Sequence, residues 1–136
     1  IRAVIYIAGQ SLLDKKVSVK MVAKAIDSPE AYTSKILQLL SRSEVIFSEK
    51  GPTGGYFMDR KKLAGATLGD IVLALDGDEV YRACGLGLRE CNEKMPCPVH
   101  TRYSRIRGEL VTMLDTTSVK DLAMGTKEGT SYLRTK

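Results

Sequence analysis

The sequence has few of the residues that build disulfide-bonded or histidine-based sites. Its 136 residues include no tryptophan, only two phenylalanines, three cysteines and a single histidine. Three cysteines cannot all pair with one another, which argues against a secreted disulfide scaffold and for a reducing, cytoplasmic compartment. A catalytic zinc site needs an open position and a nearby general base, and no second histidine or carboxylate at motif spacing supplies them, so we expect no enzyme.

Long hydrophobic runs are also absent from the sequence. No apolar run reaches the roughly 18 residues of a membrane-spanning helix, and the first residues carry no basic leader or small-residue cleavage site. We therefore expect no membrane partner and no signal peptide. A hydrophobic fraction of 43% over 136 residues instead predicts one globular domain with a core of its own.

The excess of positive over negative charge is confined to the first half of the chain. Residues 1–62 carry 11 lysines and arginines against 6 acidic residues, whereas residues 63–136 carry 10 of each. The whole formal net charge of +5 therefore lies in the first segment. A basic half beside a neutral half is typical of a polyanion-binding module joined to a second region, although an unevenly charged surface would give the same pattern.

Residues 1–42 predict three helices. Apolar residues recur at helical spacing over 1–12, Ser18 is a suitable N-cap for a second helix, and Ser28 with Pro29 suits the start of a third. The stripe of the third helix that we expect to face inward is Tyr32, Ile36, Leu39 and Leu40. The residues left outside are Ala31, Ser34, Lys35, Gln38 and Arg42. Two short helices joined by a tight turn indicate a helix-turn-helix, although helical bundles share the pattern.

Residues 45–58 predict a β-hairpin that follows the helices directly. The segments "VIF" and "YFM" favour strands, and "GPTGG" between them supplies the glycines that a hairpin tip requires. Lys50 lies at the start of the tip, within reach of phosphates or a minor groove. A helix-turn-helix followed by a glycine-rich hairpin is the winged-helix layout, a mainly α fold with a small β wing. This order and the basic half favour DNA binding over a hairpin that only closes a core.

The second half of the chain predicts further helices. Thr67 is expected to cap a helix that Gly77 ends, and Thr116 or Thr117 is expected to cap a short last helix. Between them a long helical pattern carries an apolar stripe of Tyr103, Ile106, Leu110, Met113 and Leu114. A long helix that leaves a small domain is expected to pair with a second copy in a twofold homodimer, unless it packs back on its own domain. The predicted parts are a winged helix-turn-helix over 1–77, a cysteine-rich loop over 78–100, a dimerisation helix over 101–124 and a flexible tail over 125–136.

All three cysteines and the only histidine fall within the 17 residues "CGLGLRECNEKMPCPVH". Six residues separate Cys84 from Cys91, five separate Cys91 from Cys97, and two separate Cys97 from His100. Thiolates and a neutral imidazole are metal ligands, and four of them in one polar loop match a four-coordinate site. The spacing permits zinc or an iron–sulfur cluster and does not separate the two.

Several motifs together resemble the IscR/NsrR-type family of iron–sulfur-dependent winged-helix transcription regulators. The similar segments are "SPEAYTSKILQLLSRSEVI", "KGPTGGY", "ATLGDIVLALDG" and the three cysteines with their trailing Cys-x-x-His. The resemblance implies that Cys84, Cys91, Cys97 and His100 hold an iron–sulfur cluster, with [2Fe–2S] preferred over [4Fe–4S]. It also implies a DNA-binding set of Ser28, Ala31, Tyr32, Ser34, Lys35, Gln38, Lys50, Gly51, Thr53 and Gly54. The protein would then be a repressor that binds a palindromic operator in double-stranded DNA as a homodimer, with its cluster modulating the binding.

Three departures from the family pattern leave alternatives open. The first cysteine gap is one residue longer, Lys50 replaces the usual wing arginine, and Ser34 stands where an acidic residue reads DNA. Some members take their fourth ligand from a carboxylate of the partner's first helix. Such a carboxylate and His100 are therefore alternative candidates for the fourth ligand. The same fold could also use zinc or a thiol redox switch in place of iron. A small electron carrier or metalloenzyme is a more distant alternative.

Overall fold

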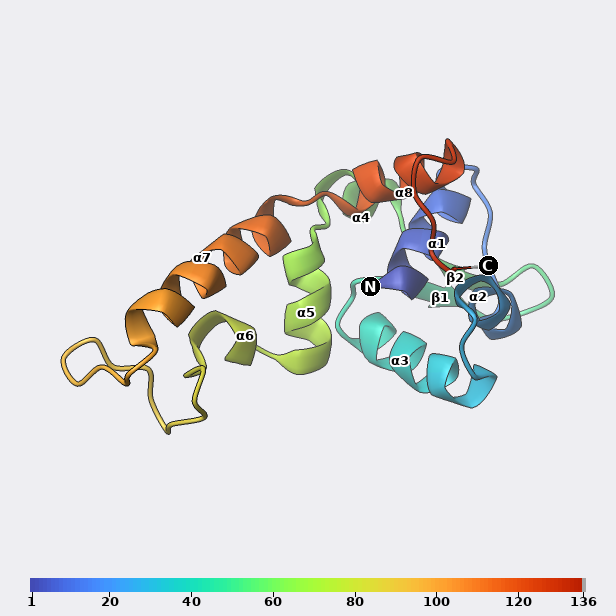
Figure 1. Ribbon diagram of the computed structural model, residues 1–136. Coiled ribbons are helices and arrows are strands. Elements are labelled where there is room, and N and C mark those ends of the chain that lie inside the picture. The colour runs from blue at the N-terminus through green and yellow to red at the C-terminus, as the bar shows by residue number, and fades with distance from the viewer. Residues whose placement is uncertain (136) are drawn as a thin grey trace.

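The computed structural model describes residues 1–135, and Lys136 lies outside the described residues. That part of the chain is mostly helical, with one small antiparallel hairpin at the edge of the molecule (Figure 1). The elements are α1 (Arg2–Ser11), α2 (Val19–Ile26), α3 (Glu30–Arg42), β1 (Phe47–Glu49), β2 (Gly55–Phe57), α4 (Arg60–Gly65), α5 (Leu68–Asp76), α6 (Glu79–Arg82), α7 (His100–Thr116) and α8 (Val119–Lys127). The predicted mainly α fold with a β-hairpin wing is confirmed.

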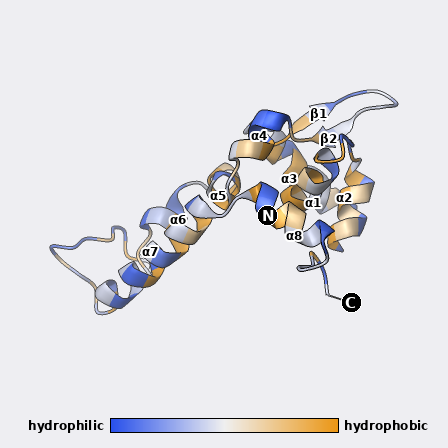
Figure 2. Ribbon diagram, turned by 90° about the horizontal axis from the view of Figure 1, so that it is seen from above, coloured by the Kyte–Doolittle hydropathy of each residue, from blue (hydrophilic) through white to orange (hydrophobic). Residues whose placement is uncertain are grey.

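Two parts are distinguishable in shape, and we call them the head and the arm. The head contains α1 to α4, the hairpin and α8, and its core includes the fully buried Ile7, Leu37, Leu40 and Ile46. The arm contains α5, α6, α7 and the cysteine loop, and it extends away from the head (Figures 1 and 2). The wing projects from the head at the end opposite to the cysteine loop (Figure 2).

Helix α8 returns to the head and packs against α1, although more than 100 residues separate them in sequence (Figure 1). Its Val119 and Ala123 are fully buried in the core of the head. The segment after α8 also contacts the head, because Arg2 Nη1 donates a hydrogen bond to the carbonyl oxygen of Leu133 at 3.2 Å. The residues predicted as a flexible tail from 125 onward therefore include the last turn of α8 and a segment that lies against α1.

Local capping explains where several helices begin. Ser18 Oγ accepts a hydrogen bond from the backbone N–H of Met21, as predicted. Thr67 forms a full capping box with Asp70, and Gly77 ends α5 with a positive φ, both as expected. The prediction for α8 was wrong, because Ser118 caps it and Thr116 still belongs to α7.

The start and the buried face of α3 differ from the prediction. Pro29, not Ser28, is the N-cap residue, and the Thr33 hydroxyl donates to the Pro29 carbonyl oxygen at 3.0 Å. That hydrogen bond satisfies the hydroxyl, so Thr33 can be buried at 2% exposure with Leu37 and Leu40. Tyr32 and Leu39, which were predicted to face inward, are exposed by 61% and 42% respectively, and Ile36 is half-buried.

The wing begins later than predicted. Phe47 pairs with Phe57 in antiparallel register, whereas Val45 and Ile46 precede the strand and are buried in the head. The hairpin is also joined to the segment before α2, because Val17 and Tyr56 exchange two backbone hydrogen bonds of 3.0 and 2.8 Å. A side chain at Gly55 would stand 2.8 Å from the carbonyl oxygen of Val17, and its φ is +144°. Only glycine allows this close approach of the two segments.

Two short helices were not predicted. Helix α4 is capped by Asp59, whose Oδ1 accepts from the backbone N–H of Lys62 at 2.7 Å. Helix α6 has a single turn and leads into the cysteine loop. Among the described residues, no helix is both long and apolar enough to cross a membrane.

Candidate DNA-binding surface and cysteine loop

The outer face of α3 presents small and polar side chains to solvent. Ala31, Lys35 and Gln38 are exposed, Ser34 is half-buried, and Gln38 Nε2 donates to Ser34 Oγ at 3.5 Å. Small side chains allow close approach to base edges, while Ser, Gln and Lys can hydrogen-bond to them. This face therefore has the chemistry of a groove-reading surface.

Two other predicted DNA-binding residues lie at the edge of this face. Ser28 is half-buried and Tyr32 exposed, and both line a cavity of about 170 Å³ that Ile1 of the N-terminus and Leu75 of α5 also border. Their position places them between α3 and the arm. They differ in this respect from Lys35 and Gln38, which do not line that cavity.

The wing tip exposes backbone and one cation. Lys50, Gly51 and Thr53 are exposed and Gly54 is half-buried. Lys50 forms no salt bridge within residues 1–135, so its charge is available for a phosphate. By contrast, the carboxylate of Glu49 is paired with Lys16.

Lys16 is a residue that the sequence analysis did not identify. Besides its pair with Glu49, its Nζ lies 5.1 Å from the centre of the Phe57 ring. It neutralises Glu49, the acidic residue next to the wing tip, which would otherwise repel phosphates. Its partner is 33 residues away in sequence, so no local pattern could reveal this contact.

The four predicted metal ligands lie in the loop between α6 and α7 and at the start of α7. They form two donor pairs. Cys84 Sγ is 3.8 Å from Cys97 Sγ, and Cys91 Sγ is 3.4 Å from His100 Nδ1. All three cysteines are free thiols. Within the described residues, no group of three or more Cys, His, Asp or Glu side chains gathers around one point, so the predicted single four-donor cluster is found as two pairs.

Backbone turns in the loop position these donors. The N–H of Gly87 donates to the Cys84 carbonyl oxygen at 2.9 Å, and the N–H of His100 donates to that of Cys97 at 2.9 Å. Asn92 Oδ1 accepts from the N–H of Lys94 at 2.8 Å, which forms a third turn between Cys91 and Cys97. The loop therefore has a defined course without regular secondary structure.

Helix α7 contacts the loop directly beside Cys84. Arg107 Nη1 donates to the carbonyl oxygen of Ala83 at 2.6 Å, and its guanidinium carbon lies 5.8 Å from the centre of the Tyr103 ring. The Tyr103 ring covers Gly85 so closely that a Cβ there would stand 2.6 Å from a ring carbon. The two α7 side chains thus hold the residues on both sides of Cys84. Neither contact was predicted, because each joins residues at least 18 positions apart.

The surroundings of Cys84 favour its thiolate. The thiol is only 8% exposed. Backbone hydrogen bonds at Leu86 and Leu88 lower the pKa of Cys84, and Cys97 and the positive charge of Arg107 lower it further, while burial acts in the opposite direction. The thiolate is the form that binds metals and attacks disulfides.

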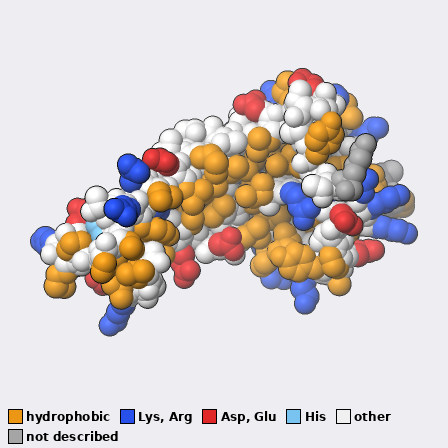
Figure 3. All heavy atoms as spheres, in the orientation of Figure 1, with side chains coloured by type: hydrophobic (Ala, Val, Ile, Leu, Met, Phe, Trp, Pro, Cys, Tyr) orange, Lys and Arg blue, Asp and Glu red, His pale blue; other side chains and the backbone are white. Residues whose placement is uncertain are grey.

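The arm carries an exposed apolar stripe on α7. Ile106, Leu110 and Met113 are 57%, 39% and 47% exposed, and Figure 3 shows hydrophobic side chains in a band along α7 and α5. Tyr103 is half-buried against the loop. Leu114, which was predicted to belong to the stripe, is 4% exposed and lies in the core of its own chain.

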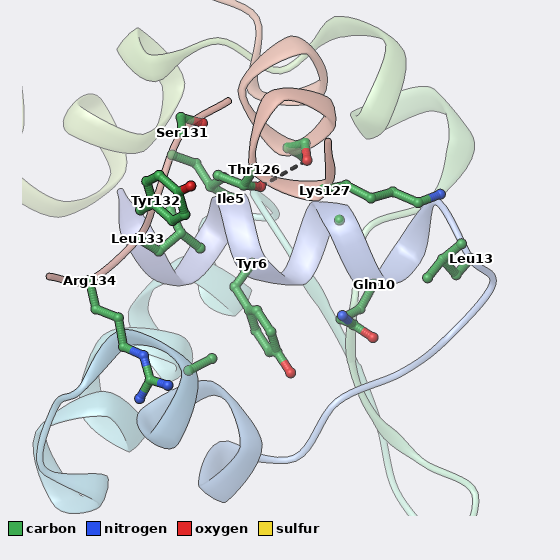
Figure 4. Close-up of a pocket in the computed structure, with 13 residues that line it drawn as sticks. Ile5, Tyr6, Gln10, Leu13, Thr126, Lys127, Ser131, Tyr132, Leu133 and Arg134 are labelled. Atoms are coloured by element: carbon green, nitrogen blue, oxygen red, sulfur yellow. Dashed lines mark hydrogen bonds between the residues drawn. The ribbon is translucent and has the colours of Figure 1, made fainter. Parts of the chain in front are cut away.

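A separate pocket of about 520 Å³ lies between α1, α8 and the segment after α8. Tyr6 and Gln10 enter it from α1, and Tyr132 and Leu133 border it on the other side (Figure 4). It is lined by none of the predicted DNA-binding or metal-binding residues.

Comparison with known proteins decides the family of this chain. The family described as "Rrf2: Iron-dependent Transcriptional regulator" matches residues 1–125. The chain belongs to the Rrf2 family. Among curated proteins it is 30% identical over 111 residues to an HTH-type transcriptional regulator of Aquifex aeolicus (strain VF5), covering 80% of this chain and 76% of that protein. Rrf2 members are transcription regulators, so the expectation of a regulator and not an enzyme is confirmed.

Solved structures confirm the Rrf2 fold. CymR, described as the global cysteine regulator of B. subtilis, aligns with a TM-score of 0.70 at 25% identity over 90% of this chain and 88% of CymR. IscR of T. potens aligns with a TM-score of 0.71 at 18% identity over 94% of this chain and 83% of that chain. The predicted resemblance to IscR-type regulators is thereby confirmed at the level of the Rrf2 family.

Proposed function

We propose that this Rrf2 regulator is a repressor that binds a palindromic operator as a homodimer, and that an iron–sulfur cluster in the cysteine loop modulates the binding. The head would read the operator with α3 and the wing, and the apolar stripe of α7 would form the dimer contact. The cluster-binding residues would be Cys84, Cys91, Cys97 and His100. The observation that carries the cluster proposal is the presence of two close pairs of soft donors in one loop.

The head has the charge and geometry for duplex DNA. The outer face of α3 offers Lys35 and Gln38, and the wing offers Lys50 with an exposed glycine tip. With α3 in the major groove and the wing along the adjacent DNA backbone, α3 would contact the bases and the wing would contact the phosphates. Because each head reads one half-site, a twofold dimer requires a palindromic operator.

The stripe on α7 supports the dimer proposal. Ile106, Leu110 and Met113 recur at steps of four and three, so they share one face of a helix that leaves the head. A second copy is the partner that this face fits, because the same stripe on another chain would be self-complementary across a twofold axis. The contact would hold the two arms together and set the spacing of the heads.

Two donor pairs suit a binuclear cluster better than a single ion. In a [2Fe–2S] cluster with four protein ligands, each iron takes two of them. Cys84 with Cys97 would hold one iron, and Cys91 with His100 the other. A zinc ion would need all four donors to converge on one point. When bound, the cluster would supply a redox-active iron centre whose stability depends on its ligands and surroundings.

The arm offers a route from the loop to DNA. Arg107 and Tyr103 join the residues beside Cys84 to α7, α7 packs on α5, and α5 packs on α3. Ordering or releasing the loop would therefore act on the orientation of α3 through packed elements. A typical coupling free energy of about 1–3 kcal/mol would change operator affinity by roughly 5- to 150-fold.

The proposal is tested on full-length protein purified without air. A brown sample that absorbs between about 400 and 450 nm and contains equal iron and sulfide would support the cluster, whereas a colourless zinc-bearing sample would support the zinc alternative. Simultaneous replacement of the three cysteines by serine should abolish the bound metal. Met95→Leu is the matched control, because it removes an exposed sulfur from the same loop and should leave metal content unchanged.

The regulatory step is tested by operator binding of loaded and metal-free protein at one salt concentration. We expect a difference of at least several-fold between the loaded and the metal-free parent, and the triple serine variant, which takes up no metal, should bind the operator like the metal-free parent. Equal affinities for the loaded and the metal-free parent would overturn the sensing role, while leaving DNA binding itself intact.

A further inference from the structure

We infer that in the metal-free protein Cys84 and Cys97 form a disulfide, while Cys91 remains a thiol beside His100. This is a second chemical state of the loop that goes beyond the proposed function. It depends only on the cysteines and their geometry, so it does not require that the loop binds a cluster.

The geometry selects this pair among the three cysteines. The sulfur atoms of Cys84 and Cys97 are already 3.8 Å apart, whereas a disulfide bond is about 2.05 Å long. Closing the gap takes a shift of less than about 2 Å, and Cys97 lies in a loop without regular secondary structure that can supply it. Cys91 has a different neighbour, because its sulfur lies against His100 Nδ1.

The exposure of the two thiols determines which of them reacts with an oxidant first. Of this pair, Cys97 is half-buried and Cys84 is only 8% exposed, so an external oxidant reaches Cys97 first. Cys91 is half-buried as well, but its neighbour is His100 and not a second thiol. With a low-molecular-weight disulfide RSSR as oxidant, the Cys97 thiolate attacks one sulfur, a mixed disulfide forms and one RS⁻ leaves. The Cys84 thiolate then attacks Cys97 Sγ, and the second RS⁻ leaves. The two protein thiols lose two electrons and two protons, and RSSR becomes two RSH.

The disulfide would compete with metal for the same side chains. It consumes both members of one donor pair, so Cys91 and His100 would remain as only two ligands. It also joins Cys84 to Cys97. Ala83, the residue before Cys84, is hydrogen-bonded to Arg107 of α7, and Cys97 lies three positions before α7 begins. The oxidised loop would thus be closed on itself by a covalent bond beside α7 and unable to take up a cluster or zinc.

Peptide mapping provides the test, since trypsin separates the three cysteines. Arg82, Arg89, Lys94 and Arg102 place Cys84, Cys91 and Cys97 on three different tryptic peptides. Full-length protein is freed of metal with a chelator under argon, incubated with oxidised glutathione, alkylated and digested. We expect the peptides of Cys84 and Cys97 to be linked and Cys91 to be alkylated. The linked species should run as a monomer in a non-reducing denaturing gel.

Three single variants separate this pairing from its alternatives. Cys91→Ser should form the same disulfide at an unchanged rate. Cys84→Ser should retain glutathione at Cys97, because the thiol that would displace it is missing. In Cys97→Ser, the thiol of Cys84 should react with glutathione much more slowly, because Cys84 is buried. A disulfide that includes Cys91, a link between two chains, or three free thiols after oxidation would each overturn the inference. A protein that forms the disulfide and never binds iron would overturn the proposed cluster and leave this inference standing.

Discussion

Replacing Ile106 by alanine tests whether the stripe on α7 is the dimer contact. Burying an isoleucine side chain completely contributes about 1.5–3 kcal/mol. In the single chain 57% of Ile106 remains exposed, so a partner can add about half of that amount, or roughly 1–1.5 kcal/mol. Twofold symmetry places each substitution in the interface twice, which brings the expected loss to about 2–3 kcal/mol.

The predicted consequence is a dimer dissociation constant raised by roughly 30- to 140-fold, since each 1.4 kcal/mol corresponds to about a factor of ten. Sedimentation velocity over a dilution series measures this constant directly. The chain itself should remain folded, because the replaced side chain is mostly exposed and alanine favours a helix. Circular dichroism of the same samples checks that point.

Arg105→Ala provides the matched control on the same helix. Its side chain is 79% exposed and lies outside the apolar stripe, so the truncation removes a longer side chain from another face of the helix. The dimer constant should stay near that of the parent. If Ile106→Ala dimerises as tightly as the parent, the partner does not cover this stripe and the α7 dimer is refuted.

Three further predictions concern the head and the arm. Lys50→Ala should reduce the slope of log affinity against log salt by about 1, whereas Lys120→Ala, an exposed lysine on α8, should not change it; filter binding or fluorescence anisotropy at several salt concentrations measures both slopes. Thr67→Ala should lower the free energy of unfolding by about 1 kcal/mol in urea titrations because it removes the cap of α5, and Thr67→Ser should restore it. The pKa of Tyr81 is raised chiefly by burial and by its 2.9 Å hydrogen bond to Asp115, so the folded state holds this proton more tightly than the unfolded state. The parent should therefore lose stability as pH rises above about 10, and Tyr81→Phe should lose less over the same range.

Features carried by short sequence patterns were predicted well. The caps at Ser18 and Thr67, the glycine after α5 and the hairpin all depend on residues within a few positions of one another. Such signals act before any tertiary contact forms, so they can be read from the sequence directly. The arrangement that identifies a winged helix therefore followed from local chemistry alone.

The faces of helices were predicted less well. Hydrophobicity alone assigned Tyr32 and Leu39 to the buried face of α3. Thr33 is buried in the core instead, because its hydroxyl donates a hydrogen bond to the Pro29 carbonyl oxygen. The return of α8 to α1 was missed for a different reason. It depends on packing between segments more than 100 residues apart, which no periodicity records.

In the cysteine loop, the sequence identified the candidate ligands but not how they pair in space. Composition identified Cys84, Cys91, Cys97 and His100 as the candidate ligands. Their division into two pairs could not be predicted, because it results from turns in the loop and from the two α7 side chains that hold the residues beside Cys84.

The position of α5 has a consequence for engineering this protein. Since α5 packs on both α3 and α7, these two helices share it as a common support. The loop lies outside this support, between Gly77 and the first turn of α7. A foreign loop could therefore be grafted between these two points, and under the proposed mechanism it would act on α3 only if it also made contacts with Tyr103 and Arg107 of α7.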